Sequence, residues 1–235
     1  VFADPRSGLR ECDESVVLAF DSIVRVSQFV SAHTPDVVLW IGEPPASKVL
    51  TQWVSSLDAF KIHISSTPSV IDPQHSNNLS VNGDVGLMCE RLIPLVRASS
   101  KEWLLSWQKA ETAAQKAIAA WTAENFSEPT VARVLTSSLA VGDQLVVSSS
   151  MPIRDVEWFG SVTSGVTVHS NRGTNGIDGV VSTAVGVALG SGSPTSLLIG
   201  DVALLHDVNG LLALNRRTLD MSIVVTNNDG GSIFS

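Results

Sequence analysis

The chain has 235 residues, 44% of them hydrophobic, and a formal net charge of −8 at pH 7, which suits one large or two modest domains. The negative charge argues against a nucleic-acid partner, since phosphate backbones need a basic surface, and no apolar run is long enough to span a membrane. The start shows no signal-peptide pattern, and Cys12 and Cys89 form neither a CxxC pair nor a disulfide framework, so we expect a protein of the reducing cytoplasm.

A long predicted helix divides the chain into two parts, and the first part is predicted to form a small α/β layer. Residues 101–124 contain neither Gly nor Pro and are rich in Ala, Gln and Lys, which predicts a long surface helix that bridges two domains. The chain therefore divides near residues 98 to 128. Before this division, apolar runs and helical periodicity predict strands at 37–41 and 60–64 and helices at 47–57 and 84–96.

The second part of the chain alternates strands with helices, which is typical of an α/β fold with a parallel sheet. Glu128-Pro129-Thr130 opens its first element. The strands are predicted near 144–148, 166–169, 195–199 and 221–226.

Two oxygen-bearing side chains follow neighbouring strands of this second part. Asp201 comes directly after the apolar run 196–200, and Asn228 follows the run 221–226. A right-handed βαβ crossover would bring both strand tips to one edge of a parallel sheet, where open α/β folds bind ligands. The connecting helix is predicted to begin near Ala203 and to run for roughly four turns, with its N-terminal amides facing an anion. Its apolar face is formed by Leu204, Leu205, Val208, Leu211 and Leu212.

An Asp carboxylate, an Asn amide oxygen and a loop carbonyl are the hard oxygen donors that Mg²⁺ accepts together with two phosphate oxygens. The spacing of Asp201 and Asn228 therefore resembles a thiamine diphosphate motif. The alternative is that Asp201 is only a helix N-cap and that residues 227–230 form a polar turn.

Three further segments, 148–155, 170–179 and 227–234, extend this pattern. They read SSSMPIRD, SNRGTNGIDG and NNDGGSIF, and together with Gly200-Asp201 they resemble the 2-succinyl-5-enolpyruvyl-6-hydroxy-3-cyclohexene-1-carboxylate synthases in order and spacing. These are thiamine diphosphate-dependent enzymes of menaquinone biosynthesis. The resemblance implies a thiamine diphosphate-binding fold with parallel sheets flanked by helices.

The resemblance also implies a domain order. Residues 1–98 would be part of the central α/β domain, 99–128 a linking helix, and 129–235 a C-terminally incomplete diphosphate-binding domain. The chain would then be a fragment without the N-terminal pyrimidine domain. The family keeps its activating glutamate in that domain, supplied across a subunit interface, so no catalytic residue is assigned here. A homodimer or homotetramer is expected, and the fragment alone is expected to be inactive.

Cofactor contacts are implied for several residues of the matching segments. Asp201, Asn228 and the Gly230 carbonyl match positions that hold Mg²⁺ or Mn²⁺ and the diphosphate. Ile177 matches an apolar residue that props the pyrimidine of thiamine diphosphate, and Ile233 one that lies beside the thiazolium. Ordinary core packing is the alternative for Ile177 and Ile233.

Substrate contacts are implied for Ser150, Arg154, Arg172, Phe234 and Lys48. Guanidinium groups suit the carboxylates of 2-oxoglutarate and isochorismate because they bind them in a planar, bidentate way. The alternatives are exposed helix or loop residues for the basic side chains, a polar serine at a strand end, and a core phenylalanine. Next to Lys48 the chain departs from the pattern, because Val49 stands where some members carry a second basic residue.

The implied activity is decarboxylation of 2-oxoglutarate and 1,4-addition of the succinyl unit to isochorismate. Two rival interpretations stay open at this point. One is another thiamine diphosphate enzyme, of the acetolactate synthase or 2-oxoacid decarboxylase type. The other is a non-catalytic subunit that lacks the pyrimidine domain.

Overall fold

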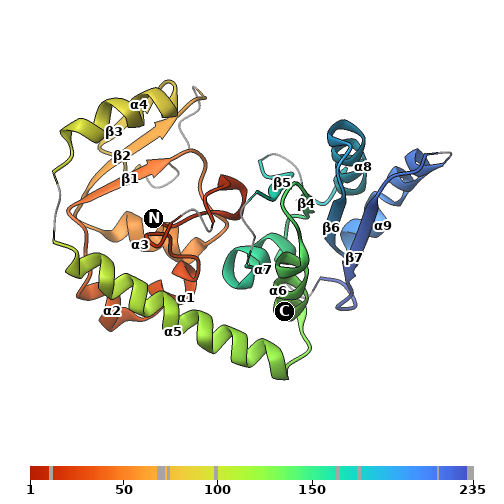
Figure 1. Cartoon of the computed structure of the whole chain (residues 1–235), viewed down its shortest axis with the longest axis horizontal. Coiled ribbons are helices and arrows are strands. Elements are labelled where there is room, and N and C mark those ends of the chain that lie inside the picture. The colour runs from red at the N-terminus through yellow and green to blue at the C-terminus, as the bar shows by residue number, and fades with distance from the viewer. Residues whose placement is uncertain are drawn as a thin grey trace. The chain divides into compact units, whose positions relative to one another are not determined.

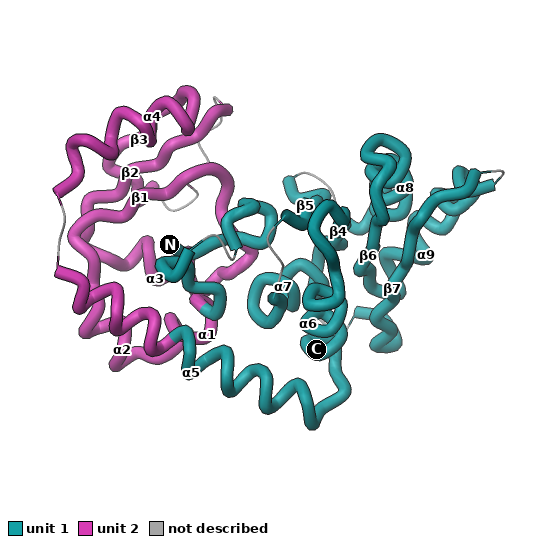
Figure 2. The backbone as a smooth tube through the Cα atoms, in the orientation of Figure 1, with its two compact units in different colours: residues 1–19, 111–235 teal, residues 20–110 magenta. Residues whose placement is uncertain are grey.

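A computed structural model describes residues 1–10, 13–67, 72, 75–97, 100–161, 165–173, 176–215 and 217–231. The chain forms two compact units, residues 20–110 and residues 1–19 with 111–235 (Figure 2). The boundary between them falls inside the long helix α5 (Glu102–Glu124). The domain limits expected at residues 98 and 128 stay predictions. None of the described helices is long and apolar enough to cross a membrane.

The unit of residues 20–110 contains a small parallel sheet in the order β1-β2-β3 (Figure 1). Its register pairs Val37 with Phe60 and Ile62 with Leu79. The predicted strands and helices of this part are confirmed, whereas β3 and the short helices α1 and α2 were not predicted. The elements are α1 (Phe20–Val24), α2 (Ser27–Ser31), β1 (Val37–Ile41), α3 (Lys48–Ser56), β2 (Phe60–Ser65), β3 (Leu79–Asn82), α4 (Val85–Leu92) and the 3-10 helix η2 (Ile93–Leu95).

The first nine residues of α5 belong to this unit and supply its central aromatic side chain. Trp107 is only 1% exposed, so the expectation of a purely surface helix is wrong for this face of α5. Rings pack around Trp107 at centroid distances of 4.9 Å for Phe29 and 5.7 Å for Trp103. Burial of an aromatic ring of this size contributes strongly to the stability of a small unit.

The unit of residues 1–19 and 111–235 is built on a second parallel sheet in the order β5-β4-β6-β7 (Figure 1). The predicted strands are all present, with end points shifted by one residue at most sites. The elements are the 3-10 helix η1 (Pro5–Ser7), α6 (Glu128–Ser138), β4 (Gln144–Val147), α7 (Met151–Phe159), β5 (Thr167–Ser170), α8 (Val180–Ser191), β6 (Thr195–Gly200), α9 (Asp201–His206), the 3-10 helix η3 (Val208–Leu214) and β7 (Met221–Thr226).

The central strands β4 and β6 are buried on both faces. Val146, Leu197 and Ile199 join Val181 and Ala184 of α8 in one core cluster. Because successive side chains of a strand point to opposite faces, the equally buried neighbours of these residues face the other side, and α7 packs against β6. Continuous apolar runs are what such doubly covered parallel strands require, which is why the sequence predicts them well.

The helix predicted near Ala203 is present, but its predicted length of about four turns is wrong. The α-helix α9 begins at Asp201 and ends at His206, and the chain continues as the 3-10 helix η3. A Cβ at Gly210 would lie 2.8 Å from Ser182 Oγ, so only glycine allows the backbone to approach α8 this closely. Tighter winding breaks the single apolar face: Leu204 and Leu211 pack against the core cluster, whereas Leu205 and Leu212 are 73% and 72% exposed.

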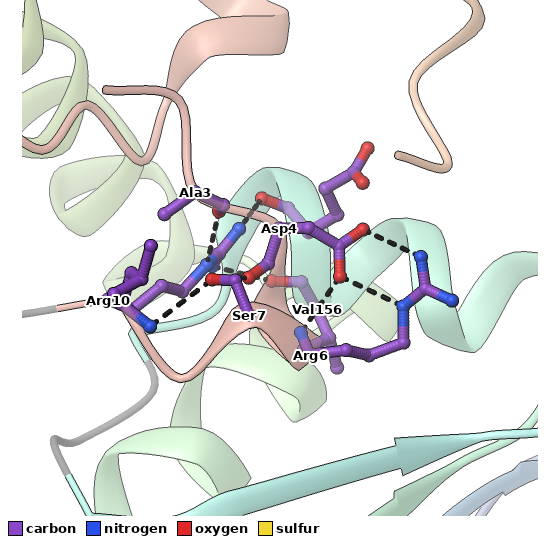
Figure 3. A network of polar contacts seen from close by, with 8 residues as sticks. Ala3, Asp4, Arg6, Ser7, Arg10 and Val156 are labelled. Atoms are coloured by element: carbon purple, nitrogen blue, oxygen red, sulfur yellow. Dashed lines mark hydrogen bonds and ion pairs between the residues drawn. The ribbon is translucent and has the colours of Figure 1, made fainter. Parts of the chain in front are cut away.

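The N-terminal segment joins this unit through one buried guanidinium group (Figure 3). Arg10 is 2% exposed and donates hydrogen bonds to the carbonyl oxygens of Ala3, Val156, Gly160 and Glu157 at 3.1, 3.1, 3.0 and 2.7 Å. Three of these carbonyls lie at the C-terminal end of α7, where a cation is favourable to the helix dipole. Desolvation lowers the pKa of Arg10 to about 10, so the group is still charged at neutral pH.

Replacement of this guanidinium should therefore be costly. In Arg10→Met the four carbonyls lose their donor while the side-chain volume is largely kept, and we expect the free energy of unfolding to fall by about 3 kcal/mol or more. The matched control is Arg217→Met, at an exposed arginine, which should change stability by about 0.5 kcal/mol or less. Urea denaturation measures both, and an equal loss in the two variants would contradict the assignment.

Candidate functional site

The C-terminal edge of the β5-β4-β6-β7 sheet brings the predicted metal ligands together. The register pairs Gly200 with Thr226, so Asp201 and the loop that starts at Asn227 leave neighbouring strands at the same level. A Cβ placed on Gly230 would lie 3.9 Å from Asp201 Oδ2, which shows that the loop after β7 approaches the Asp201 carboxylate. Backbone conformation favours this approach, because Asp229 and Gly230 both have left-handed φ angles, of 60° and 79°.

The Asn228 side chain is held from the start of α6. Its Nδ2 donates a hydrogen bond of 2.8 Å to Glu128 Oε1, across 100 residues of sequence. Among the described residues, neither Asn228 Oδ1 nor the Asp201 carboxylate has a hydrogen-bond partner. Both oxygens are therefore available to a ligand that the chain itself does not supply.

These donors fit a hard divalent cation bound to a diphosphate. The set contains one carboxylate, one amide oxygen and the nearby Gly230 backbone, which matches oxygen ligation by Mg²⁺ that is completed by phosphate oxygens. The described residues contain no group of three or more His, Cys, Asp and Glu side chains that could hold a metal without such a partner. Two buried hydroxyls at the same sheet edge, Ser148 Oγ and Ser170 Oγ, also have no hydrogen-bond partner within the described part of the chain.

The segment that precedes α7 carries two of the predicted substrate residues. Ser150 adopts φ 71° and ψ −131°, a conformation that is uncommon for a residue with a side chain. The guanidinium of Arg154, one helical turn later, donates a hydrogen bond to the Ser150 carbonyl oxygen. Arg154 therefore supports the strained turn at Ser150, and the two residues form one local unit.

The loop after β5 lies next to this turn. Ser149 Oγ donates to the Asn171 carbonyl oxygen at 3.3 Å, and Asn171 Nδ2 donates to Thr183 Oγ1 of α8 at 3.0 Å. The Arg172 amide donates to the Ser170 carbonyl oxygen at 2.8 Å. The two segments that the sequence placed 22 residues apart, counted from Ser149 to Asn171, are thus joined in the structure.

Arg172 lies in a basic cluster with Arg154 and Arg6, and the sequence did not predict that Arg6 belongs to it. Its pKa is lowered first by desolvation and then by the positive charges of Arg6 and Arg154, and Glu157 and Asp4 oppose this shift. Arg6 lies in η1, which packs against β5, and it forms an ion pair with Asp4 at 2.9 Å. No motif surrounds Arg6, so only the fold reveals that this residue is close to Arg172.

The other predicted contacts fall in different places. Ile177 is half-buried and packs against the core cluster of α8 and β6, so its packing role is established and a cofactor contact stays a prediction. Lys48 is an exposed residue that begins α3, after Ser47 caps the helix, and it belongs to the other compact unit. Ile233 and Phe234 lie outside the described residues.

Asp155 is a buried acid that the sequence analysis quoted in a motif but did not assign. It is 2% exposed, and its Oδ1 has no hydrogen-bond partner among the described residues. Burial and the negative charge of Glu128 raise the pKa of Asp155 to about 7, although Arg154 opposes the shift. A weak acid with this pKa holds its proton through much of the range below neutrality.

The raised pKa predicts a pH-dependent stability. The unfolded chain releases this proton near pH 4, whereas the folded chain retains it until about pH 7, so Asp155 makes the folded state less stable as the pH rises through this window. Asparagine stays neutral. We therefore expect Asp155→Asn to become more stable relative to wild type between pH 4 and pH 8, by up to about 4 kcal/mol. Urea denaturation across this range tests it, and a constant difference between the two proteins would rule it out.

Comparison with known proteins identifies the family. A family model described as the middle domain of thiamine pyrophosphate enzymes matches residues 4–147. Three curated 2-succinyl-5-enolpyruvyl-6-hydroxy-3-cyclohexene-1-carboxylate synthases are similar. The enzyme of Myxococcus xanthus is 38% identical over 92% of this chain and 37% of its own length. That of Chloroflexus aurantiacus is 39% identical over 100% of this chain and 42% of its own length. That of Staphylococcus aureus is 36% identical over 100% of this chain and 41% of its own length.

The chain thus spans about two fifths of the length of these relatives. A solved structure from Mycobacterium smegmatis, described as "a putative thiamin diphosphate-dependent enzyme", shares the fold, with a TM-score of 0.55 and 20% identity over 88% of this chain and 40% of that one. The parallel sheets flanked by helices agree with this likeness. The chain therefore belongs to the thiamine pyrophosphate enzymes whose middle domain it matches, and its sequence relatives among them are 2-succinyl-5-enolpyruvyl-6-hydroxy-3-cyclohexene-1-carboxylate synthases.

Proposed function

We propose that the protein containing this chain is a thiamine diphosphate-dependent synthase. It would decarboxylate 2-oxoglutarate and add the succinyl unit in a 1,4 fashion to isochorismate, giving 2-succinyl-5-enolpyruvyl-6-hydroxy-3-cyclohexene-1-carboxylate. The observation that carries the proposal is that one unit holds both the oxygen donors around Asp201 and the arginine cluster around Arg172. The first suits a metal diphosphate and the second suits acidic substrates.

Asp201, Asn228 and the Gly230 carbonyl would hold Mg²⁺ or Mn²⁺ and, through it, the diphosphate. Their oxygens have no competing partner among the described residues, and only one of the ligands is charged. A single carboxylate leaves the cation with most of its charge for the phosphate groups. When bound, thiamine diphosphate supplies the means to decarboxylate a 2-oxo acid and to transfer the remainder as a nucleophile.

Arg154 and Arg172 would bind and orient the carboxylates of the substrates. Both 2-oxoglutarate and isochorismate carry two carboxylates, and partly desolvated guanidinium groups bind such anions strongly. Ser150 would add a hydroxyl at the strained turn that Arg154 supports. The repulsion among the neighbouring arginines that lowers the pKa of Arg172 would be relieved once an anion is bound.

The remaining contacts rest on the family resemblance. Ile177 would extend from the core cluster toward the cofactor, and Lys48 would contact a substrate carboxylate. Ile233 and Phe234 would lie beside the thiazolium and the substrate. The activating glutamate would come from a domain outside this chain, across an interface of a homodimer or homotetramer. The cytoplasm remains the expected location.

The metal and diphosphate site predicts a loss of cofactor binding in Asp201→Ala. In the full-length protein with Mg²⁺ present, thiamine diphosphate affinity should fall by about 100-fold or more, because the only carboxylate ligand is lost. Isothermal titration measures the affinity directly. Asp220→Ala is the control, since this carboxylate precedes β7 at the opposite end of the strand. Unchanged cofactor affinity in Asp201→Ala would exclude this site.

The arginine cluster predicts the substrate preference. In Arg172→Ala, kcat/KM for the joint consumption of 2-oxoglutarate and isochorismate should fall by about 10- to 100-fold while cofactor affinity is kept. Arg217→Ala, at an exposed arginine, is the matched control. A cofactor-loaded wild type that ignores isochorismate but consumes pyruvate would favour an acetolactate synthase or decarboxylase. A full-length protein that binds no cofactor would favour a non-catalytic subunit.

A further inference from the structure

The amide of Asn228 can serve a metal only in one of its two orientations. Rotation by 180° about the last side-chain bond exchanges Oδ1 and Nδ2, and only Oδ1 can bind a cation. The structure fixes this choice through Glu128, whose Oε1 accepts the hydrogen bond from Asn228 Nδ2 at 2.8 Å. An ionised carboxylate has no proton to donate, so the reversed amide would face it oxygen to oxygen.

We propose that Glu128 is a positioning residue that holds the Asn228 amide with its oxygen turned toward the bound divalent cation. This inference rests on the proposed metal site and deepens it, since Glu128 itself would not touch the metal. Among the described residues Asn228 Oδ1 accepts no hydrogen bond, so the contact that fixes the nitrogen leaves the oxygen for the ligand. Partners of this kind around a metal site typically change metal affinity by about 10- to 100-fold.

Glu128 is itself placed firmly enough to act in this way. It is the first residue of α6, followed by Pro129, whose ring fixes the backbone at the helix start. Ser127 caps the same helix by accepting from the Thr130 amide at 3.4 Å. Further along α6, Arg133 donates to the Phe159 carbonyl oxygen at 2.9 Å, which ties α6 to the end of α7.

A purely structural role for Glu128 is the competing explanation. An acidic residue in the first turn stabilises a helix through its dipole, and that effect would also disappear on substitution. The test must therefore separate orientation of the amide from stability of α6. Glutamine provides this separation, because its amide can either accept or donate a hydrogen bond whereas glutamate can only accept.

The experiment measures Mn²⁺ binding by electron paramagnetic resonance in the full-length protein, with thiamine diphosphate present. Glu128→Leu should weaken Mn²⁺ affinity by about 10- to 100-fold. Glu128→Gln should stay close to wild type, because its carbonyl oxygen still accepts from Asn228. Glu124→Leu, at an exposed glutamate near the end of α5, is the matched control and should bind Mn²⁺ as the wild type does.

The decisive comparison reverses the hydrogen bond. In Asn228→Asp a carboxylate faces Glu128, and Mn²⁺ affinity should fall because the two acceptors repel each other. In the double variant Asn228→Asp with Glu128→Gln, the glutamine nitrogen can donate to the aspartate, and affinity should recover relative to Asn228→Asp alone. Loss of the Glu128 charge at the start of α6 would have the same sign in both backgrounds, so a rescue seen only in the Asn228→Asp background shows that the side chains at positions 128 and 228 act through their contact.

The outcomes separate the inference from the function on which it rests. If Asp201→Ala loses Mn²⁺ while Glu128→Leu binds it like wild type, the metal site stands and the role of Glu128 is overturned. Absence of rescue in the double variant, with denaturation midpoints that show a folded protein, overturns it as well. If Asp201→Ala binds Mn²⁺ unchanged, the proposed metal site itself fails, and the inference fails with it.

Discussion

The buried guanidinium of Arg10 is the constraint on which the candidate site depends most. It donates hydrogen bonds to three carbonyl oxygens at the C-terminal end of α7, where an α-helix leaves its last carbonyls unpaired. The N-terminal end of the same helix follows Ser150 and carries Arg154, so the position of these residues is set from the opposite end of α7. A desolvated cation is costly unless its hydrogen bonds are satisfied, which makes the N-terminal segment and α7 interdependent. The contacts that hold the site therefore come from a segment about 150 residues away in sequence.

The parallel sheet explains why the site could be built from short, separate segments. Parallel pairing brings the C-terminal ends of all four strands to one edge, and each matching segment begins where one of these strands ends. The central strands β4 and β6 are largely buried and apolar, so chemistry is confined there to the residues that follow them. Ser148 Oγ and Ser170 Oγ, which have no hydrogen-bond partner within the described residues, fit this division, since they lie where the strands β4 and β5 end.

The sequence predicts this architecture well where local pattern and tertiary packing agree. Buried strands appear as continuous apolar runs, and the capping residues Ser47, Asp84 and Ser127 mark helix starts. Prediction failed for β3, which has only four residues and is largely exposed, and for the helix after Asp201, where the approach of Gly210 to α8 overrides the apolar periodicity. Asp201 and Asn228 could be found because they follow strands. Arg6, Glu128 and Asp155 could not, because their importance depends on neighbours that are distant in sequence.

The arrangement of charge around α7 gives the site two chemically different sides. Arg154 and Asp155 are consecutive on this helix, and successive helical residues point about 100° apart. Arg154 therefore faces the cluster with Arg172, whose pKa its charge lowers, whereas Asp155 senses the negative charge of Glu128. Glu128 in turn holds Asn228. One helix thus borders a basic region suited to acidic substrates and an acidic region next to the proposed cation. In a chain of net charge −8, this separation sets Arg154 and Arg172 apart from Glu128 and Asp155, while Glu157 and Asp4 balance part of the positive charge around Arg172.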